Sequence, residues 1–389
     1  MAESTAVFAI FLIFTGAAVL ATFALMARQA MIVAYIVVGF LLGPAGFGWV
    51  HDEGWLAEVS SIGIMFLLYL LGLNMLPSRL WQMLSEALGV TLISCLAFAV
   101  VGAVIAAIFG FGLTEALLIG GCTMFSSTII GLKLLPTTTL HHKHTGQMMI
   151  SVLLLQDLIA IIFLLVVQGY GEGSSPLSGI AREMVALPVV VGVALVAEKY
   201  VMEPLIARFD QIHEYVFLLV IAWCLAIAEG ASALGLSHEI GAFIAGVALA
   251  DCPVSAFISE SLKPLRDFFL VLFFFSLGAS FDTGYLLPTI MPAIALSVGL
   301  MLAKPFVFQW LFVHAGERRR QSFEVGVRLG QLSEFSLLIA FLAMQTGLFA
   351  TRSAYVVQLA VMITFVVSSY LIVMRYPTPI AVRDSLRRD

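Results

Sequence analysis

The feature that most constrains this chain is a nearly unbroken succession of apolar stretches separated by short polar loops. Most of them approach the length of about 20 residues at which an α-helix crosses the hydrocarbon core of a bilayer. Hydrophobic residues make up 61% of the 389 residues and charged residues 11%, whereas soluble domains carry about 25% charged residues. Because backbone polar groups in lipid must bond within their own segment, the sequence predicts an all-α polytopic membrane protein.

Thirteen segments qualify as predicted spans, and helix-breaking residues agree with their ends. Gly43-Pro44 closes the second segment, and Pro77 and Pro136 follow the third and the fifth. The run from Val7 to Ala27 lacks a basic flank and is too long for a secretory signal, so we take it as the first span. The predicted spans are 7–26, 31–49, 56–75, 86–110, 115–132, 147–168, 185–202, 213–231, 238–252, 265–280, 285–313, 323–345 and 353–374.

The basic residues predict the orientation of the chain. With thirteen spans and an outside N-terminus, fifteen Lys and Arg residues fall on the cytoplasmic side and only Arg182 and Arg352 fall outside. This excess is typical of cytoplasmic loops, so we predict an outside N-terminus and a cytoplasmic C-terminus. Lys304 and Arg328 fall within spans. The fifteen are Arg28, Arg79, Lys133, Lys143, Lys199, Arg208, Lys263, Arg266, Arg318, Arg319, Arg320, Arg375, Arg383, Arg387 and Arg388.

Two halves of nearly equal length indicate an internal repeat within one transmembrane domain, residues 1–389. Segments 1–6 cover residues 7–168 and segments 8–13 cover 213–374, with 185–202 as a linker helix and 375–389 as a cytoplasmic tail. A single linker span gives the two six-helix halves opposite orientations. Inverted repeats are typical of secondary transporters, which bind their substrates near the midplane at discontinuous helices. Short matches recur at an offset of about 206: Leu71-Gly72 with Leu277-Gly278, Gly39 with Gly246, and Ser127 with Ser333.

Both halves contain a candidate broken helix in the same place. The fifth span holds Cys122-Thr-Met-Phe-Ser-Ser-Thr-Ile-Ile-Gly131, and the twelfth holds Gly330-Gln-Leu-Ser-Glu-Phe-Ser336. Unwound backbone at membrane depth is tolerated only where it lines a cavity or is buried in protein. The alternative is that the hydroxyls bond back to the preceding helical turn. Two clusters at symmetric positions favour broken helices. Gly241, Gly246 and Gly278 are interpreted as close-packing positions.

Asp157 bears most directly on function because it lies near the middle of an apolar span. A carboxylate at that depth costs about 2.5–3.5 kcal/mol on insertion scales, so we expect it to bind a cation, carry a proton or pair with a base. The alternative is a structural ion pair, for example with Lys304. Gln156 is a second polar group in the same apolar surroundings.

The remaining polar residues leave several interpretations open. Glu334 could orient the second helix break, contact an ion, or pair with Lys304 or Arg328, and Arg328 fits a side chain that snorkels to the cytoplasmic interface. For the loop histidines we favour a solvated loop over a pH sensor; these are His141, His142 and His144. The cysteines lack disulfide or metal-ligand spacing, so we expect buried thiols and no cofactor; they are Cys95, Cys122, Cys224 and Cys252.

Seven short strings, in order and on the expected spans, resemble the Kef-type members of the monovalent cation:proton antiporter family over nearly the whole chain. That family has the thirteen-span sodium/proton-antiporter fold, with crossed discontinuous helices in a core domain. The strings are Val38-Gly-Phe-Leu-Leu-Gly-Pro44, Leu70-Leu-Gly-Leu73, Ser126-Ser-Thr128, Leu155-Gln-Asp157, Gly241-Ala-Phe-Ile-Ala-Gly246, Leu272-Phe-Phe-Phe-Ser-Leu-Gly278 and Ser333-Glu-Phe335.

The resemblance implies roles for individual residues. Asp157 aligns with the aspartate that binds the transported cation and exchanges the proton, and Gln156 beside it resembles the potassium-efflux branch, so these two are the expected ligands of the metal ion. Lys304 matches the basic residue on the span facing the aspartate. Three hydroxyl residues are expected beside the site; they are Ser126, Ser127 and Thr128.

The resemblance also implies an assembly. Spans 4–6 and 11–13 would form a mobile core, and spans 1–3 and 8–10 would form the interface of a homodimer in a bacterial inner membrane. The family usually has Glu where this chain has Asn74, which would alter a charged contact. Kef proteins continue into a cytosolic nucleotide- and glutathione-binding domain, so two alternatives stay open: a short member of the family, or a cytosolic regulatory domain or subunit outside these 389 residues. No nucleic-acid partner is expected.

The predicted function is therefore exchange of a monovalent cation for a proton by alternating access. With one carboxylate at the site, proton and cation compete for the same group, and Gln156 stands where a second acid would be, so we expect electroneutral exchange. K⁺ is favoured and Na⁺ is the alternative. A cation-coupled solute symporter or a passive cation channel would be the other functions. No metalloprotease or serine-hydrolase motif is present in the sequence, which disfavours an enzyme.

Overall fold

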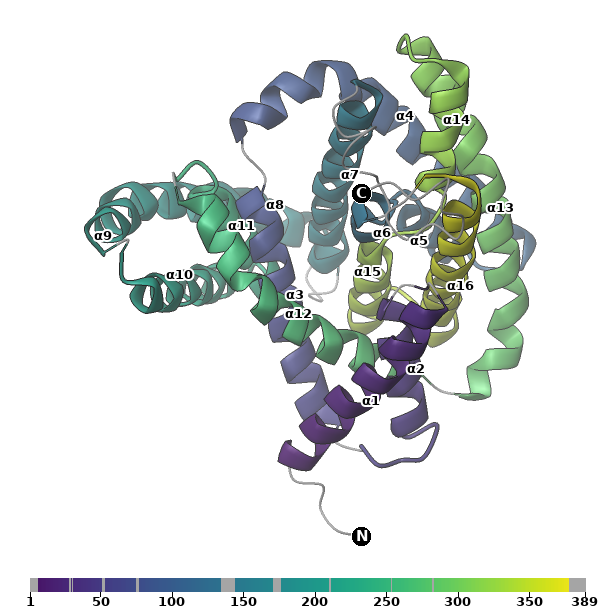
Figure 1. Ribbon diagram of the computed structural model, residues 1–389, viewed down its shortest axis with the longest axis horizontal. Coiled ribbons are helices and arrows are strands. Elements are labelled where there is room, and N and C mark those ends of the chain that lie inside the picture. Colours follow the sequence, from purple (N-terminus) through teal and green to yellow (C-terminus); the bar gives the residue numbers. More distant parts are fainter. Residues whose placement is uncertain are drawn as a thin grey trace. The chain divides into compact units, whose positions relative to one another are not determined.

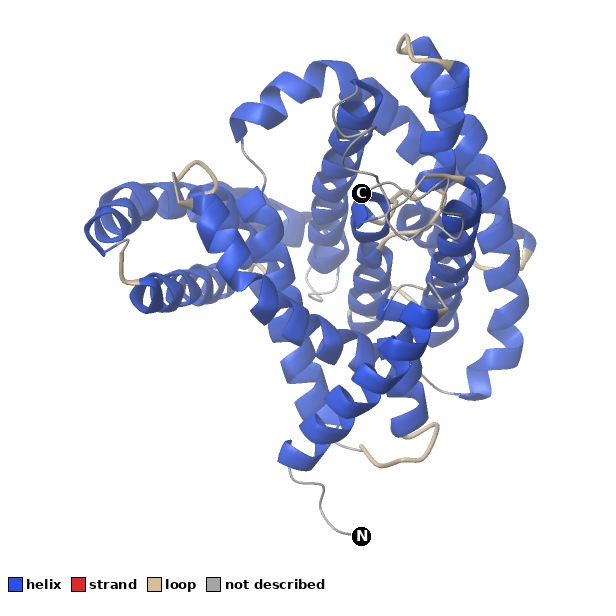
Figure 2. Ribbon diagram, viewed as in Figure 1, coloured by secondary structure: helices blue, strands red, loops and turns tan. Residues whose placement is uncertain are grey.

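The computed structural model describes residues 6–27, 29, 31–50, 53–74, 77–133, 144–170, 176–209, 211–252, 254–281 and 283–377. Within these ranges every regular element is helical and no strand occurs (Figures 1 and 2). The elements are α1 (Ala6–Met26), α2 (Met31–Leu42), α3 (Glu53–Asn74), α4 (Pro77–Ile108), α5 (Leu113–Thr123), α6 (Thr128–Lys133), α7 (His144–Tyr170), α8 (Pro176–Ala197), the π-helix η1 (Glu198–Met202), α9 (Glu203–Phe209), α10 (His213–Ala233), α11 (His238–Leu249), α12 (Ser255–Ala279), the 3₁₀ turn η2 (Thr283–Tyr285), α13 (Leu286–His314), α14 (Arg319–Arg328), α15 (Glu334–Gln345) and α16 (Thr351–Arg375).

Each predicted span falls on one helix or on two consecutive helices of this set. In the described part of the chain, six helices are long and apolar enough to cross a membrane by themselves. They are Val7–Met26, Ala87–Ile108, His144–Val167, His213–Ala233, Thr283–His314 and Thr351–Arg375. Shorter apolar helical stretches are Met31–Leu42, Ser61–Leu73, Leu113–Thr123, His238–Leu249 and Glu334–Gln345. The prediction of an all-helical polytopic protein is confirmed.

Several boundaries differ from the predicted spans. The segment 31–49 is longer than its helix: α2 ends at Leu42, directly before the Gly43-Pro44 expected to close this span. The chain then turns back, so that Trp49 and Val50 donate backbone N–H groups to the Leu42 carbonyl. The linker segment 185–202 is longer than predicted, because α8 begins at Pro176 and continues through η1 and α9 to Phe209. Hydropathy detects the apolar part of a helix, whereas backbone hydrogen bonding extends into polar turns.

The chain divides into two compact units. The first unit comprises Met1–Leu20, Ala34–Trp81 and Glu172–Phe281, and therefore holds α3, α8–α12 and most of α1 and α2. The second unit comprises Ala21–Val33, Gln82–Gly171 and Asp282–Asp389, and holds α5–α7, α13–α16 and most of α4. Spans 4–6 and 11–13, which the family resemblance assigns to a mobile core, fall in this second unit.

In the first unit, α2 and α12 meet backbone to backbone. A Cβ built on Gly39 would lie 2.0 Å from the carbonyl oxygen of Phe275, and one built on Gly278 would lie 2.0 Å from the carbonyl oxygen of Ile36. Real Cβ atoms are not found so close to other atoms, so only glycine fits at either position. Close approach at small residues is how membrane helices gain packing energy in lipid.

The same arrangement joins α3 to α11. A Cβ on Gly72 would lie 2.4 Å from the Phe243 carbonyl oxygen, and one on Gly246 would lie 2.1 Å from the Tyr69 carbonyl oxygen. Gly241 lies against α10, where an added Cβ would come within 2.6 Å of the Ala228 Cα. The predicted close-packing roles of Gly241, Gly246 and Gly278 are confirmed.

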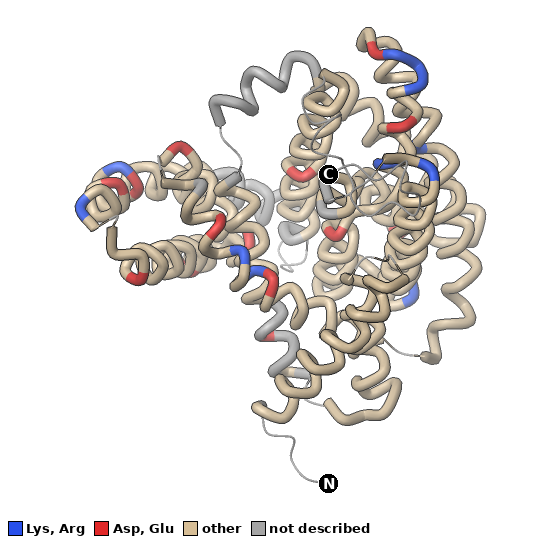
Figure 3. Tube along the Cα trace, in the orientation of Figure 1, with Lys and Arg blue, Asp and Glu red and all other residues tan. Residues whose placement is uncertain are grey.

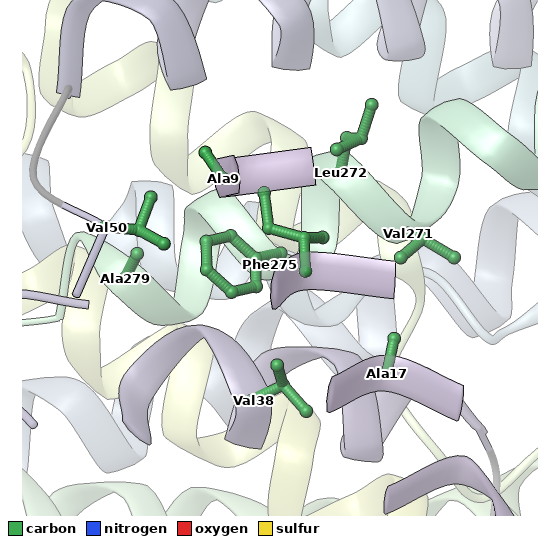
Figure 4. Packing of buried hydrophobic residues seen from close by; sticks show 9 residues of the cluster. Ala9, Ala17, Val38, Val50, Val271, Leu272, Phe275 and Ala279 are labelled. Carbon is green, nitrogen blue, oxygen red and sulfur yellow. The ribbon is translucent and has the colours of Figure 1, made fainter. Parts of the chain in front are cut away.

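A hydrophobic cluster joins α1, α2 and α12 within this unit (Figure 4). Phe275 is fully buried in it, next to Val38 of α2 and Leu272 of α12. Small residues of α1, such as Ala9 and Ala17, let the helices pack close together.

In the second unit, α13 packs along α14 and α16, and α15 packs against α5, α7 and α16 (Figure 1). Most buried polar side chains of the described residues belong to this unit. They gather where two helices of the unit are interrupted, which places the candidate site there.

Candidate ion-binding site

The fifth predicted span is a broken helix. Helix α5 ends at Thr123, residues 124–127 are unwound, and α6 restarts at Thr128. The Ser127 hydroxyl accepts a hydrogen bond from the Ile130 N–H at 3.1 Å, which gives the new helix an N-cap. Thr123 bonds back to the Gly120 carbonyl, as the alternative interpretation proposed, but Ser126 and Ser127 do not.

The twelfth predicted span is broken in the same way. Helix α14 ends at Arg328 and α15 restarts at Glu334, with residues 329–333 unwound between them. Ser333 is the N-cap of α15 and accepts a hydrogen bond from the Phe335 N–H at 3.1 Å. The two restarts, and the two capping serines Ser127 and Ser333, are 206 residues apart.

The two breaks touch each other inside the second unit. The Ser126 hydroxyl donates to the Leu329 carbonyl at 2.9 Å. From the other side, the Ser336 hydroxyl donates to the Cys122 carbonyl at 2.6 Å. These bonds satisfy carbonyl groups that lost their helical partners when the helices were interrupted.

Lys304 joins the two breaks from α13. Its side chain is fully buried, and its ammonium donates to the Phe125 carbonyl at 2.8 Å, to the Ser126 hydroxyl at 3.0 Å and to the Gln331 carbonyl at 2.8 Å. A lysine has three N–H donors, and all three are used. The ion pair with Asp157 that the sequence left open is therefore not formed in this structure. Instead, the positive charge lies beside the C-terminal ends of α5 and α14, where helix dipoles are negative.

Gln156 also forms hydrogen bonds with the unwound backbone of the first break. Its side-chain oxygen accepts the Ser126 N–H at 3.1 Å, and its side-chain nitrogen donates to the Met124 carbonyl at 3.3 Å. Both ends of the amide are thus bonded to unwound backbone. The sequence predicted a cation ligand at this position. In the structure, the Gln156 side chain supports the unwound backbone of the first break.

Asp157 lies one residue further along α7 and is 0% exposed. The Thr128 hydroxyl donates to its Oδ2 atom at 2.9 Å. Its Oδ1 atom is buried without a hydrogen-bond partner among the described residues. Buried carboxylate oxygens normally find a partner, so this oxygen has lone pairs left to accept a proton or a cation.

Glu334 is the second carboxylate near Asp157. It occupies the first turn of α15, is 6% exposed, and lies close enough for the two charges to interact. Lys304 is not its partner, because the three ammonium protons are donated elsewhere. Its position at the start of a helix favours a negative charge.

Arg328 does not snorkel to the interface, and that expectation was wrong. The side chain is fully buried and forms an ion pair with Glu324 one turn earlier, at 2.8 Å. It also donates to the Pro377 carbonyl at 2.9 Å and lies over the Tyr376 ring. The residues that follow α16 thus cover the end of α14, which keeps this arginine out of solvent.

Sequence reasoning missed a second polar network. The Gln331 side chain accepts the Ser368 hydroxyl at 2.9 Å and donates to the Ser127 carbonyl at 3.4 Å, and Thr364 accepts the Leu332 N–H at 3.2 Å. The available signal was a set of hydroxyl residues within the last apolar span. This network ties α16 to both breaks.

The other predicted residues lie away from this site. His144 bonds Glu317 at 2.7 Å, while His141 and His142 lie outside the described residues. The four cysteines are buried free thiols, as predicted. Within the described ranges, no group of three His, Cys, Asp or Glu side chains is arranged to hold a metal ion. Asp157 and the Thr128 hydroxyl bonded to it are the groups whose oxygen atoms could contact a transported cation.

Known proteins resemble this chain in sequence. Residues 10–374 match the family model described as sodium/hydrogen exchanger, transmembrane. The chain is 26% identical over 320 residues to K(+) efflux antiporter 4 of Arabidopsis thaliana, a match that covers 80% of this chain and 54% of the relative. The chain thus spans about half the length of that relative.

Two solved structures share the fold. A structure of the sodium proton antiporter MjNhaP1 from Methanocaldococcus jannaschii at pH 8 matches with a TM-score of 0.70 and 17% identity, over 94% of this chain and 95% of that one. An electron-microscopy map of the same protein matches with a TM-score of 0.67 and 17% identity, over 95% and 96%. At this identity the likeness establishes the fold alone.

Proposed function

Because this chain belongs to the sodium/hydrogen exchanger family of monovalent cation:proton antiporters, we propose that it exchanges a monovalent cation for a proton by alternating access, with Asp157 as the shared site. Members of this family are integral membrane transporters and not enzymes. The resemblance seen in the sequence is confirmed at the level of the family. The cation, the site and the mechanism belong to the proposal.

The state of Asp157 is the observation that carries this proposal. The carboxyl group is fully buried, one oxygen accepts the Thr128 hydroxyl, and the other has no hydrogen-bond partner among the described residues. A buried carboxylate without a base is stable only when it is neutralised. A proton on the free oxygen and a cation against it are alternative ways to do so.

Charge balance then favours electroneutral exchange. Gln156 is neutral and is bonded to the first break at both ends. Lys304 is bonded to three oxygens of the breaks and does not neutralise Asp157. Asp157 then accepts one proton or one monovalent cation, while Glu334 keeps its charge in the first turn of α15. A transport rate that responds to an imposed membrane potential would contradict this stoichiometry.

The oxygens beside Asp157 complete a ligand set of the kind that alkali cations prefer. The Thr128 hydroxyl can turn its lone pairs to a cation once the proton leaves the carboxyl group, and the unwound carbonyls supply further oxygens. We favour K⁺ over Na⁺, because the curated relative is named a K(+) efflux antiporter. The solved relatives are named sodium proton antiporters, but at their low identity this similarity concerns the fold.

We further propose thirteen spans in two inverted six-helix repeats, residues 7–168 and 213–374, with the N-terminus outside and the C-terminus in the cytoplasm. The contacts of the first unit support the repeats. Gly39 of α2 packs on α12, and its counterpart Gly246 of α11 packs on α3. A two-fold axis that exchanges the halves would turn one contact into the other. Ser127 and Ser333 each cap a restarted helix with the side-chain hydroxyl, which accepts the Ile130 N–H and the Phe335 N–H respectively.

The biological assembly follows the family resemblance. We propose a homodimer in a bacterial inner membrane, formed through spans 1–3 and 8–10. The same resemblance leads us to propose a cytosolic regulatory domain or subunit as its partner.

The test is transport by purified protein in liposomes that contain a trapped pH dye. A proton gradient is imposed, and K⁺, Na⁺, Li⁺ or choline is added to wild type and to Asp157→Asn. Cation-dependent collapse of the gradient is expected for wild type and is expected to be lost in the variant. Since proton and cation compete, the cation concentration needed for half-maximal exchange should rise as the pH falls.

A matched pair of variants controls for damage to the site. Thr128→Ser keeps the hydroxyl that bonds Asp157, and should exchange ions. Thr128→Val keeps the size of the side chain but removes that hydrogen bond, and should alter the cation requirement. Equal gradient collapse in wild type and Asp157→Asn would refute Asp157 as the site.

A further inference from the structure

One face of α13 is apolar and exposed along most of its length. Six large side chains, each between 41% and 66% exposed, follow one another at intervals of three or four residues. They are Met291, Ile294, Val298, Leu302, Phe306 and Trp310. Residues at these intervals lie on one side of a helix. The other side of α13 carries the buried Lys304. The exposed face is therefore the side that contacts lipid.

The lipid-facing stripe runs directly into a cluster of positive charge. Helix α13 ends at His314, and Gly316, with φ +93°, lets the chain reverse into α14. Three consecutive arginines, Arg318, Arg319 and Arg320, form the N-cap and first turn of α14, and all three are exposed. Figure 3 shows these basic positions, in blue, at the start of α14.

The acidic residues near these arginines, Glu317 and Glu324, are bonded to other residues. Glu317 bonds His144 at 2.7 Å and also accepts the Thr145 hydroxyl, both from α7. Glu324 forms an ion pair with Arg328 at 2.8 Å. No ion pair of the described residues involves Arg318, Arg319 or Arg320. Their charges are therefore open to an external anion.

We propose that this arginine cluster, residues 318–320, binds the headgroup of an anionic phospholipid. A guanidinium forms paired hydrogen bonds with phosphate oxygens. Basic residues just beyond a membrane helix attract anionic headgroups. Trp310 lies one turn before the end of α13, and tryptophan is enriched at the boundary between acyl chains and headgroups. The apolar stripe and the cluster thus match the two ends of one lipid.

The continuity of these two surfaces favours a lipid over a soluble anion or an acidic protein segment. Neither of those would contact the exposed apolar face of α13. The positive-inside bias alone would also place arginines here, but it would not require them to retain any particular lipid. Selective retention is therefore the property to measure.

Helix α14 is also the first half of the second broken helix, which ends three residues before the Gln331 carbonyl that Lys304 contacts. A headgroup held at its first turn would restrain that helix. We expect exchange to depend on anionic lipid for this reason. This second expectation rests on the proposed function, whereas lipid binding does not.

The experiment uses the full chain in neutral detergent, titrated with phosphatidylglycerol or phosphatidylcholine. Native mass spectrometry measures the retained lipid, and thermal melting measures stabilisation. Wild type should retain phosphatidylglycerol selectively. The combined variant Arg318→Gln, Arg319→Gln and Arg320→Gln should bind it on the order of 100-fold more weakly, or about five-fold for each arginine.

Two further variants control for charge and position. Lysine at the same three positions preserves the charge and should retain most of the binding. The combined variant Lys199→Gln, Arg208→Gln and Lys263→Gln removes the same charge from the first unit and should bind as wild type does. Undiminished binding by the glutamine variant at 318–320, or an equal loss in this control, would overturn the proposal. Glycerol phosphate that stabilises wild type as well as the lipid does would identify a soluble-anion site and would also overturn it.

Discussion

In the first unit, α2 meets α12 and α3 meets α11 through glycine backbones that leave no room for a side chain. In the second unit, the helix breaks meet through buried polar groups, and Lys304 alone supplies three hydrogen bonds to them. Glycine contacts fix the distance between helices and carry no charge. The polar contacts hold unwound backbone in place and surround a carboxylate. The chain thus separates the residues that set its packing from those that set its electrostatics.

The largest loss of stability is expected for Lys304→Met. The change leaves three buried oxygens without their donor, which should lower the free energy of unfolding by about 3–5 kcal/mol. Thermal melting of the purified protein measures the loss. Leu302→Ala, at an exposed position of the same helix, is the matched control and should stay close to wild type. Equal melting temperatures for the two variants would show that the lysine does not hold the breaks together.

In the first unit, Gly278→Ala should have the next largest effect. The new methyl group would lie 2.0 Å from the Ile36 carbonyl oxygen, and the strain should lower the free energy of unfolding by about 2–3 kcal/mol. Exchange per folded molecule should persist, because Asp157 and the breaks are unchanged. Gly192→Ala meets no atom within 4 Å and should be neutral or stabilising by about 0.5–1 kcal/mol. If both variants melted alike, close glycine contacts would not be what holds this unit.

Gln156→Met tests whether Gln156 supports the first break or binds the transported cation. Methionine has a similar volume but makes neither of the two hydrogen bonds to the first break, so the free energy of unfolding should fall by about 1–3 kcal/mol. Cation-dependent exchange should remain, since Asp157 is kept. Melting and transport are measured on the same preparation. A weaker apparent affinity for the cation at unchanged stability would instead make Gln156 a cation ligand.

The smallest effects are expected at the two capping serines. Ser127→Ala and Ser333→Ala each remove an N-cap hydrogen bond, and each should lower the free energy of unfolding by about 1 kcal/mol. Replacement by Asp at either position is the control, because its side-chain oxygen can still accept the N-cap hydrogen bond. Similar losses in the two alanine variants would support equivalent positions in the proposed repeats, and a loss in only one would argue against that equivalence.

Local patterns were sufficient to predict much of the fold. Apolar length located a helix or a helix pair for each predicted span, and clustered hydroxyls with glycine located both breaks. Ser127 and Ser333, weak as a sequence match, prove to cap the two restarted helices. Helix boundaries were less predictable, because α8 and α12 extend beyond their apolar segments.

The contacts of the site could not be predicted from such patterns. Lys304 bonds two carbonyl groups that lie 179 and 27 residues away in sequence, and any residue type carries a carbonyl. Arg328 was expected at the interface, but the segment after α16 covers it. Gln331 was visible in the sequence, but its role depends on Ser368 being brought beside it. Such roles are set by tertiary contacts.

The bonds of Lys304 also have a kinetic meaning. Separating the two breaks would require Lys304 to release at least the Gln331 carbonyl, and the Ser126–Leu329 and Ser336–Cys122 hydrogen bonds to open. The charged bond is worth about 1.5–3 kcal/mol and each neutral one about 0.5–1.5 kcal/mol. Their sum corresponds to a slowing of roughly 10²-fold to 10⁴-fold. On the time scale of a transport cycle, the halves of both broken helices that meet at Lys304 would then travel as one body. The carboxyl group held by Thr128 would keep its surroundings during that movement, so the ion would change sides without changing its ligands.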